Sequence, residues 1–360
     1  MNQTLGDVMR AVVKYGITHV LVGFCLVPLT SFAHHSFFGR FDTESIVELQ
    51  GEVTEVFWRN PHAIIILTVE DDDGRRVTWE IETNAPVSLQ RMGISASLIN
   101  LGDEITVAGY PPTRSINEMH ANHILIPSGQ ELLMTFGLEP RWSDEGLGDD
   151  SYRFQTDGDS SDPDRGIFRV WSHTNVIPRL FSETSDLEVE VSSYPITDAA
   201  RAALAAFDRA TDNPTANCAP KGMPTIMEQP YPMEFVQAEE NILLRLEEYD
   251  LVRTIHMEGD APPANQLASS LGYSVGRWAE STLVVTTTRI NWPFFSQLGI
   301  PQSEDSVIIE RFSPTSDGSQ LNYEITVTDP VNFTEPVVLE KYWLYLPNEE
   351  ILPFDCSVRG

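Results

Sequence analysis

The sequence predicts a mainly β protein with two domains. The N-terminal domain is expected to be a five-stranded barrel like the oligonucleotide- and oligosaccharide-binding (OB) fold, and the C-terminal one an antiparallel meander closed as a lipocalin-like barrel. Segments of alternating apolar and polar residues recur along both halves, as half-buried strands require. Gly, Pro and Asp turns separate them, and residues 197–209 form the one clear helical stretch. The 360 residues are enough for two apolar cores.

The charge of the chain excludes two classes of partner. Asp and Glu number 53 against 23 Lys and Arg, which gives a formal net charge of −30. Such a chain repels phosphate backbones and anionic lipid surfaces. We therefore expect no nucleic-acid partner and no attachment to a membrane surface.

Residues 1–33 are typical of a secretory signal peptide. Arg10 and Lys14 precede an apolar run from 16 to 32, and Ser31-Phe32-Ala33 places small residues at the cleavage site. The alternative is a membrane anchor, but the run is short for a span of about 20 residues and polar near its end. The predicted mature chain begins at His34, is periplasmic or secreted, and is not inserted in a membrane.

Residues 34–130 form the predicted OB-like domain. Residues 53–58, 77–82 and 104–107 alternate cleanly, and residues 62–69 are more continuously apolar, as expected of a central strand. Residues 88–100 can form a helix between the third and fourth strands. Three strands, a helix and two strands is the OB order. Because the strands carry five glutamates (Glu52, Glu55, Glu70, Glu80 and Glu82), the domain lacks the basic groove of a nucleic-acid binder.

Three motifs in this domain carry a resemblance. They are Ala33-His34-His35-Ser36-Phe37, the GxVxxVxWxNPH pattern over residues 51–62, and the Gly102-Asp103-Glu104 turn leading to Gly109-Tyr110. Together they resemble a widespread family of exported bacterial proteins of unknown function. The resemblance covers residues 34–130 and implies export and a common domain, but no mechanism.

The histidines of this domain suggest a copper site. A mature N-terminal His34 offers its amine and imidazole to one ion, and His35 or His62 can complete a nitrogen-rich site of the kind Cu(II) prefers. The alternative is a plain terminal tail, with His62 in a turn after Pro61. His120 and His123 are expected on opposite faces of one strand, because an odd offset reverses the side chain.

Residues 131–165 have the composition of an acidic linker, with many Asp among Gly, Ser and Pro. Asp157, Asp159 and Asp162 invite a calcium-loop interpretation. The Gly at position six and the Glu at position twelve of an EF-hand loop are missing, which favours the linker.

Residues 166–360 form the predicted second domain. Residues 166–171 are expected to be its first strand, and the helix at 197–209 starts with Thr197 as its N-cap. About eight strands follow between residues 233 and 346, joined by short turns. The mature chain keeps two cysteines, and an oxidising compartment favours a disulfide between Cys218 and Cys356 over two free thiols or a metal pair.

Polar residues interrupting these strands are candidates for a ligand site in the barrel, where Arg and Trp could orient an apolar molecule with a polar end. The alternative is cross-strand salt bridges on the solvent face. The candidate ligand-binding residues are Arg253, His256, Tyr273, Arg277, Trp278, Glu310 and Arg311.

The stretch 272–278 also resembles a motif of exported proteins of unknown function that often carry a later His near residue 303, where this chain has Gln302 and Asp305.

Three enzymatic motifs are missing from the sequence: H-E-x-x-H, the P-loop and a helix-opening G-x-G-x-x-G. A site assembled in space from His256, Tyr273 and Glu310 stays open. The leading hypothesis is an exported, non-catalytic protein that binds a small or extended ligand. The alternatives are a copper-binding protein and an enzyme with its site in the C-terminal barrel.

Overall fold

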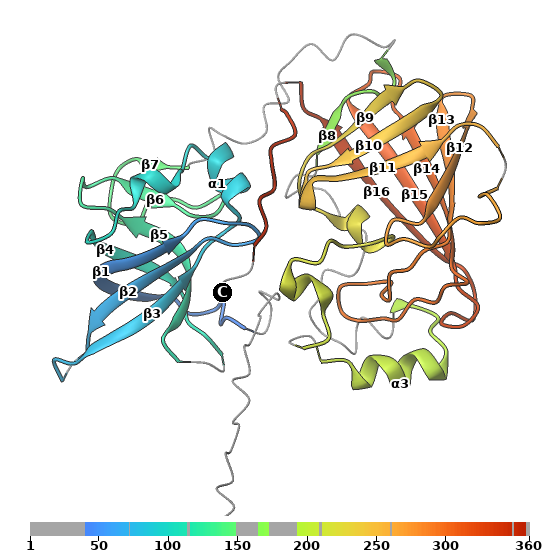
Figure 1. Ribbon diagram of the computed structural model, residues 1–360. Helices are drawn as coiled ribbons and strands as arrows, with labels where there is room; N and C mark the ends of the chain where they lie inside the picture. The colour runs from blue at the N-terminus through green and yellow to red at the C-terminus, as the bar shows by residue number, and fades with distance from the viewer. Residues whose placement is uncertain are drawn as a thin grey trace, which may run out of the picture. The chain divides into compact units, whose positions relative to one another are not determined.

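The computed structural model describes residues 40–71, 73–113, 116–148, 165–172, 193–208, 211–259, 261–347 and 349–357. These residues form two β-barrels, one from each half of the chain, with few helices (Figure 1). The predicted mainly β fold class, with a five-stranded barrel followed by a larger one, is confirmed. Residues 1–33, the predicted signal peptide, lie outside the described residues.

The first barrel has the predicted OB strand order. β1 pairs with both β2 and β4, and the barrel closes where β3 runs parallel to β5. A short helix, α1, and a 3-10 turn, η1, connect β3 to β4, and the core comes from the inward positions of the alternating strands. The elements are β1 (Val47–Phe57), β2 (Ile64–Glu70), β3 (Arg76–Glu82), α1 (Pro86–Arg91), η1 (Ala96–Leu98), β4 (Glu104–Tyr110) and β5 (Glu118–Leu125).

The first sheet continues into the segment that the composition assigns to the acidic linker. β6 (Glu131–Leu133) pairs with β5, and β7 (Gly146–Leu147) runs parallel to β6. The buried carboxylate of Glu131 accepts the backbone N–H groups of Arg141, Trp142 and Ser143 at 2.6, 2.8 and 3.0 Å. Residues 131–147 therefore belong to the first sheet, and the linker interpretation is wrong for them. Composition alone could not show that one of the acidic residues, Glu131, is buried and holds the loop at 141–143 through hydrogen bonds. Residues 149–164, with the proposed calcium-loop aspartates, lie outside the described residues.

A β-bulge changes the faces of the two histidines in β5. The register shifts so that Ala108 pairs with His123 and Gly109 with Ala121, which leaves Asn122 as the extra residue. Ala121 and Ile124 both belong to the barrel core, so His120 and His123 both face away from it. The expectation that they lie on opposite faces is wrong, because the bulge adds one residue to the alternation.

The second barrel is closed by nine strands, in the order β10-β11-β12-β13-β14-β15-β16-β8-β9. The eight strands expected after residue 233 are all present, and the strand expected at 166–171 supplies the short β8. The strands are β8 (Val170–Ser172), β9 (Met233–Ala238), β10 (Asn241–Leu246), β11 (Leu251–His256), β12 (Tyr273–Ala279), β13 (Thr282–Thr288), β14 (Val307–Pro314), β15 (Gln320–Thr328) and β16 (Val337–Tyr345).

One neighbouring pair departs from the antiparallel meander. β11 and β12 are parallel, with Ile255 opposite Ser274 and His256 opposite Val275. A parallel pair cannot be joined by a tight turn, and the long connection between His256 and Tyr273 provides the crossover. The purely antiparallel expectation is therefore wrong at this pair.

The helical elements and the disulfide of this domain match the sequence closely. α3 (Asp198–Ala206) begins after Thr197, whose hydroxyl accepts the N–H of Ala200 at 3.2 Å. The shorter helical turns are η4 (Pro214–Asn217), η5 (Thr225–Glu228) and η6 (Glu248–Asp250). Cys218 and Cys356 form the predicted disulfide, with 5.9 Å between their Cα atoms. No helix among the described residues is long and apolar enough to cross a membrane.

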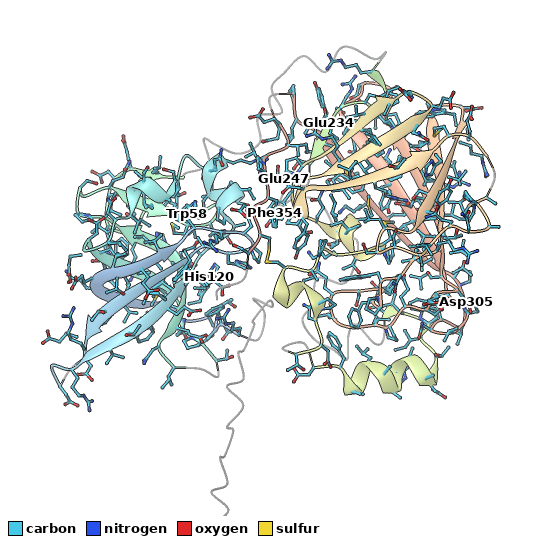
Figure 2. All side chains as sticks on the ribbon, in the orientation of Figure 1. Trp58, His120, Glu234, Glu247, Asp305 and Phe354 are labelled. Atoms are coloured by element: carbon cyan, nitrogen blue, oxygen red, sulfur yellow. A yellow bond between two sulfur atoms is a disulfide. The ribbon has the colours of Figure 1, made fainter. Side chains whose placement is uncertain are left out.

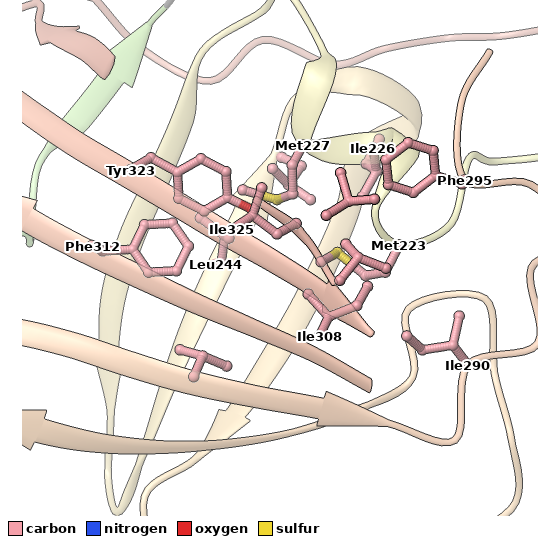
Figure 3. Close-up of a cluster of buried hydrophobic side chains, with 14 of the residues drawn as sticks. Met223, Ile226, Met227, Leu244, Ile290, Phe295, Ile308, Phe312, Tyr323 and Ile325 are labelled. Atoms are coloured by element: carbon pink, nitrogen blue, oxygen red, sulfur yellow. The ribbon is translucent and has the colours of Figure 1, made fainter. Parts of the chain in front are cut away.

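The interior of the second barrel is filled by side chains. Aromatic residues Phe312 and Tyr323 lie among aliphatic ones, and Met223 and Met227 reach this cluster from the segment around η5 (Figure 3). Trp171 and Trp343 are also fully buried in the same core. Any ligand site in this domain must therefore be sought on the outside of the strands or at a barrel end.

Candidate functional site

Two of the predicted ligand-binding residues meet inside the second barrel. Arg253 forms a bidentate ion pair with Glu310, with one contact, Nη1 to Oε1, of 3.0 Å. The guanidinium also donates to the hydroxyls of Ser274 at 2.9 Å and Thr287 at 2.7 Å, and the Tyr323 hydroxyl donates to Glu310 at 2.9 Å. All five side chains are buried.

The buried pair is satisfied from within the protein. Burial lowers the pKa of Arg253, but the facing Glu310 more than compensates and raises it, so the guanidinium stays charged. Burial raises the pKa of Tyr323 well above its ordinary value, which keeps its hydroxyl a donor. Arg253 and Glu310 are therefore core residues of a filled barrel, and their paired charges face each other in its interior.

His256 and Tyr273 meet on the outer wall of the same barrel. Arg253 and Ile255 point inward along β11, so His256 points outward, and Tyr273 is the outward neighbour of the buried Ser274. The two rings stack with 4.4 Å between their centroids and 13° between their planes. Because Glu310 is inside the wall, the site of His256, Tyr273 and Glu310 considered for an enzyme is not assembled.

The stacked rings lie in an open groove of about 460 Å³. The crossover connection between β11 and β12 forms its other side, with Pro263, Gln266, Ser269 and Leu271. Arg253 belongs to this wall as well, but its guanidinium is turned inward to Glu310. No Asp or Glu is among the described residues that line the groove.

The remaining predicted residues of this domain are separate from that groove. Arg277 is exposed at the end of β12, and Arg311 pairs with Glu324 at 3.4 Å across β14 and β15 on the solvent face. Arg311 thus follows the cross-strand alternative. Trp278 is 44% exposed and contacts the edge of Phe168, with 6.4 Å between ring centroids.

His62 belongs to a charged cluster on the first barrel. Its Nδ1 lies 3.0 Å from the carbonyl oxygen of Thr83 and 3.7 Å from Oε1 of Glu82. A carbonyl oxygen only accepts, so Nδ1 carries the proton and neutral His62 has its lone pair on Nε2. The side chain is one third exposed, so Nδ1 faces protein groups while part of the imidazole ring is accessible to solvent.

Glu82 is the centre of this cluster. Arg40 forms an ion pair with Glu82 and a second one with Glu118 at 3.2 Å, which joins β3 to β5 where the barrel closes. Burial raises the pKa of Glu82, but the electrostatic effect of the nearby His62 and Arg40 lowers it by more, so the net shift is downward. The carboxylate therefore stays ionised beside the histidines.

His120 is the last member of the cluster and lies in the first barrel (Figure 2). It is opposite Glu82 in the parallel β3–β5 pair, and its ring is 5.6 Å from that of Phe41. Burial lowers the pKa of His120 to about 4, although Glu82 acts in the opposite direction. His120 is thus a neutral, buried imidazole at pH 7.

Comparison with known protein families gives a match, and the matched residues include this cluster. Residues 24–120 match a family of unknown function (DUF6152). The predicted resemblance to such a family is thereby confirmed. The matched region contains Arg40, His62, Glu82, Glu118 and His120, and it ends before the second barrel. No functionally curated protein matches the chain.

The predicted metal ligands are His34, His35 and His62. His34 and His35 lie in the matched region but outside the described residues. Within the part of the chain that the structure describes, no three His, Cys, Asp or Glu side chains are grouped to hold a metal ion. Of the three predicted ligands, His62 is the one that lies within the described residues.

Sequence reasoning missed Arg40, Glu82 as a buried charge, and His120 as its neighbour. The signal available was Glu82 itself, a carboxylate that ends a clean β-strand pattern. Gln302, near the position where the resembling motif often carries a His, is also buried. Its amide donates to the carbonyl oxygens of Met223 at 2.8 Å and Trp292 at 3.1 Å, so it holds two loops together.

Proposed function

We propose that this protein is an exported binding protein that holds a neutral, extended ligand, such as an oligosaccharide, in the groove beside His256 and Tyr273. The observation that carries the proposal is the stacked pair of rings, 4.4 Å apart, on the wall of an open groove of about 460 Å³. Ligand sites combine such apolar faces with a few polar groups that fix orientation.

The chemistry of the lining supports a neutral ligand. Gln266 and Ser269 bring amide and hydroxyl groups, while Pro263 and Leu271 add apolar surface. Neither carboxylates nor a free guanidinium face the groove in the described residues, although the chain carries a net charge of −30. A ligand with hydroxyl groups and apolar C–H faces fits these surroundings better than an ion does.

Saturation-transfer NMR with a panel of neutral oligosaccharides tests the proposal. We expect signal transfer from the wild-type protein and at least about tenfold weaker binding for Tyr273→Ala, because a stacking face is lost. Tyr342→Ala removes a half-buried tyrosine from β16 and is the matched control, with unchanged binding expected. Failure of every oligosaccharide, or equal binding by Tyr273→Ala, would contradict the proposal.

Export is part of the same proposal. It is supported by the charge and hydropathy pattern of residues 1–33 and by the Cys218–Cys356 disulfide, which is typical of an oxidising compartment. Sequencing the N-terminus of the protein recovered from the periplasm or medium should give His34. A chain that keeps Met1 and sediments with membranes would refute export by cleavage.

A second function, copper binding, is favoured by the geometry of His62. Histidines that bind metal usually donate their other ring nitrogen to a carbonyl or carboxylate, and His62 Nδ1 faces both Thr83 O and Glu82. Arg40 also binds Glu82. His35 precedes Arg40 by five residues, and five residues of extended chain span at most about 17 Å. His34 and His35 are therefore within chain reach of His62.

Electron paramagnetic resonance with Cu(II) tests this function on correctly processed protein. We expect a nitrogen-coupled signal that changes in His62→Gln and in a His34→Ala/His35→Ala variant. His256→Asn, on the second barrel, is the control and should leave the signal unchanged. A spectrum without nitrogen coupling, or one insensitive to both sets of variants, would remove copper binding.

A further inference from the structure

A row of uncharged side chains runs from the groove across the outer wall of the second barrel. His256 is opposite Val275 of β12, and Val275 is opposite Thr286 of β13. Thr286 is in turn opposite Ile309 of β14, so the row crosses four neighbouring strands of the barrel (Figure 1). With about 4.8 Å between neighbouring strands, the row extends roughly 14 Å from His256. We call Val275, Thr286 and Ile309 the wall strip.

The wall strip faces solvent. Along their strands its three residues alternate with buried ones, which are Ser274, Gly276, Val285, Thr287, Ile308 and Glu310. Ile309 is 39% exposed, and Val275 and Thr286 are half-buried. The Thr286 hydroxyl makes no hydrogen bond with a described residue, whereas that of Thr287 is bound to Arg253 inside the barrel. The wall strip thus offers apolar surface and one uncommitted hydroxyl to a ligand.

A second uncharged row lies beside the wall strip. Tyr273 of the groove is opposite Thr288 of β13. Two residues before Ile309, Val307 of β14 is opposite Thr328 of β15. The side chains of this row also alternate with buried neighbours, so they point outward. The uncharged part of the wall is therefore two rows wide and is continuous with the groove.

The row on the other side of the wall strip carries charge. Arg277 of β12 and Arg311 of β14 are both opposite Val284. Arg311 is paired with Glu324 of β15, and Glu324 is opposite Glu340 of β16. A neutral ligand on the wall strip leaves these ionised groups in water, whereas a ligand across the charged row would have to desolvate them. In a chain of net charge −30, the groove and the wall strip together form a surface suited to a neutral ligand.

We infer that the wall strip extends the ligand groove and that the ligand is an unbranched, neutral polysaccharide chain rather than a short sugar. The inference rests on the proposed function, because the groove at His256 and Tyr273 holds the first part of the chain. Later sugar units lie on the wall strip, where their C–H faces contact Val275 and Ile309 and a hydroxyl bonds Thr286. Because the wall of a closed barrel is convex, the chain has to bend as it crosses the strands.

Calorimetric titration with short and long sugars of the same linkage tests the inference. The probes are maltose with maltoheptaose and cellobiose with cellohexaose, two neutral glucose series that differ in linkage. In at least one series we expect the longer chain to bind the wild-type protein at least about tenfold more tightly than the disaccharide. Thr286→Ala/Ile309→Ala should remove most of that gain and leave the disaccharide unchanged, because the groove alone holds a disaccharide.

The matched control lies in the charged row. Arg311→Ala/Glu324→Ala removes an exposed ion pair beside the wall strip and should bind the short and the long sugars like the wild type. Urea midpoints establish that each variant is folded. Tyr273→Ala should weaken both lengths of sugar, because both occupy the groove.

The outcomes separate this inference from the proposed function. If the disaccharides bind but the longer chains gain nothing, or if the gain persists in Thr286→Ala/Ile309→Ala, the inference is overturned and the groove remains. If no sugar of either series binds, the groove itself fails for these sugars and the inference fails with it. Sedimentation velocity of the free protein tests a second copy of the chain as the occupant: a wild-type dimer that Thr286→Ala/Ile309→Ala converts to a monomer would overturn the polysaccharide inference.

Discussion

The ion pair inside the second barrel permits a quantitative prediction. Glu310→Gln keeps the shape of the side chain but removes its charge. Arg253 would then keep a buried guanidinium, 1% exposed at its side chain, with only the Ser274 and Thr287 hydroxyls and a neutral amide as partners. Leaving one charge of a buried pair without its counter-ion costs about 3–5 kcal/mol. This is a large part of the roughly 5–15 kcal/mol that holds a typical domain folded.

The double variant Arg253→Met/Glu310→Gln should be less damaging than the sum of its parts. Both charges are gone, the Ser274 and Thr287 hydroxyls still bond each other at 3.0 Å, and the amide oxygen still accepts from Tyr323. We expect a loss of about 1–3 kcal/mol, typical of incomplete hydrogen bonding, against roughly 6–10 kcal/mol if the two single losses were additive.

Urea unfolding at pH 7 measures these free energies. Trp171 and Trp343 lie in the same core and report its loss through their fluorescence. Arg311→Gln is the control, since it breaks only the exposed pair with Glu324 and should cost less than about 1 kcal/mol. Additive losses in the double variant, or a cost below about 1 kcal/mol for Glu310→Gln, would refute this account of the barrel interior.

Three further predictions concern stability. Burial lowers the pKa of His120 to about 4, so between pH 6.5 and 4 the unfolded chain binds a proton that the folded one does not. Stability should fall by about 3 kcal/mol as the pH falls through that window, and a His120→Asn variant with the same slope in urea unfolding would contradict it. Changing Cys218 and Cys356, which are 138 residues apart, to serine should lower the free energy of unfolding by about 5 kcal/mol on the chain-entropy account. A urea unfolding midpoint that does not change when the wild-type disulfide is reduced would contradict this prediction. Glu131→Gln should weaken the bonds from the N–H groups of residues 141–143 and speed their hydrogen exchange, whereas Glu48→Gln, which loses only surface contacts to Arg141 and Trp142, should not. Equal exchange in both variants would disprove that role for Glu131.

Alternation of apolar and polar residues predicted most strands, because in a half-buried strand it follows directly from the pleat. It could not predict which way the strands of the second barrel face. Arg253 follows the apolar Val252, yet Arg253 is inside and Val252 is 50% exposed. Arg253 points inward because it pairs with Glu310, 57 residues away, and a local sequence pattern cannot reveal such a distant partner.

The candidate groove shows the same limit. His256 and Tyr273 were each identifiable as polar or aromatic interruptions of strands, but their stacking depends on the parallel β11–β12 pair. A sequence that otherwise indicates antiparallel hairpins gives no register for such a crossover. The Glu82 cluster likewise depends on closure of the first barrel between β3 and β5, which joins residues about 40 positions apart.

The two proposed functions differ in their dependence on processing, which gives a decisive comparison. A copper site that uses the amine of His34 exists only after cleavage at Ala33, whereas the oligosaccharide groove is complete within the second barrel. A protein with four extra residues before His34, which leaves no histidine among its first three residues, should therefore lose the amine-dependent Cu(II) spectrum and keep oligosaccharide binding. The processed protein should show both if both functions hold. If the extended protein binds Cu(II) with the same spectrum as the processed one, His34 has no role as an N-terminal ligand, and the role of His62 is decided by the His62→Gln variant alone.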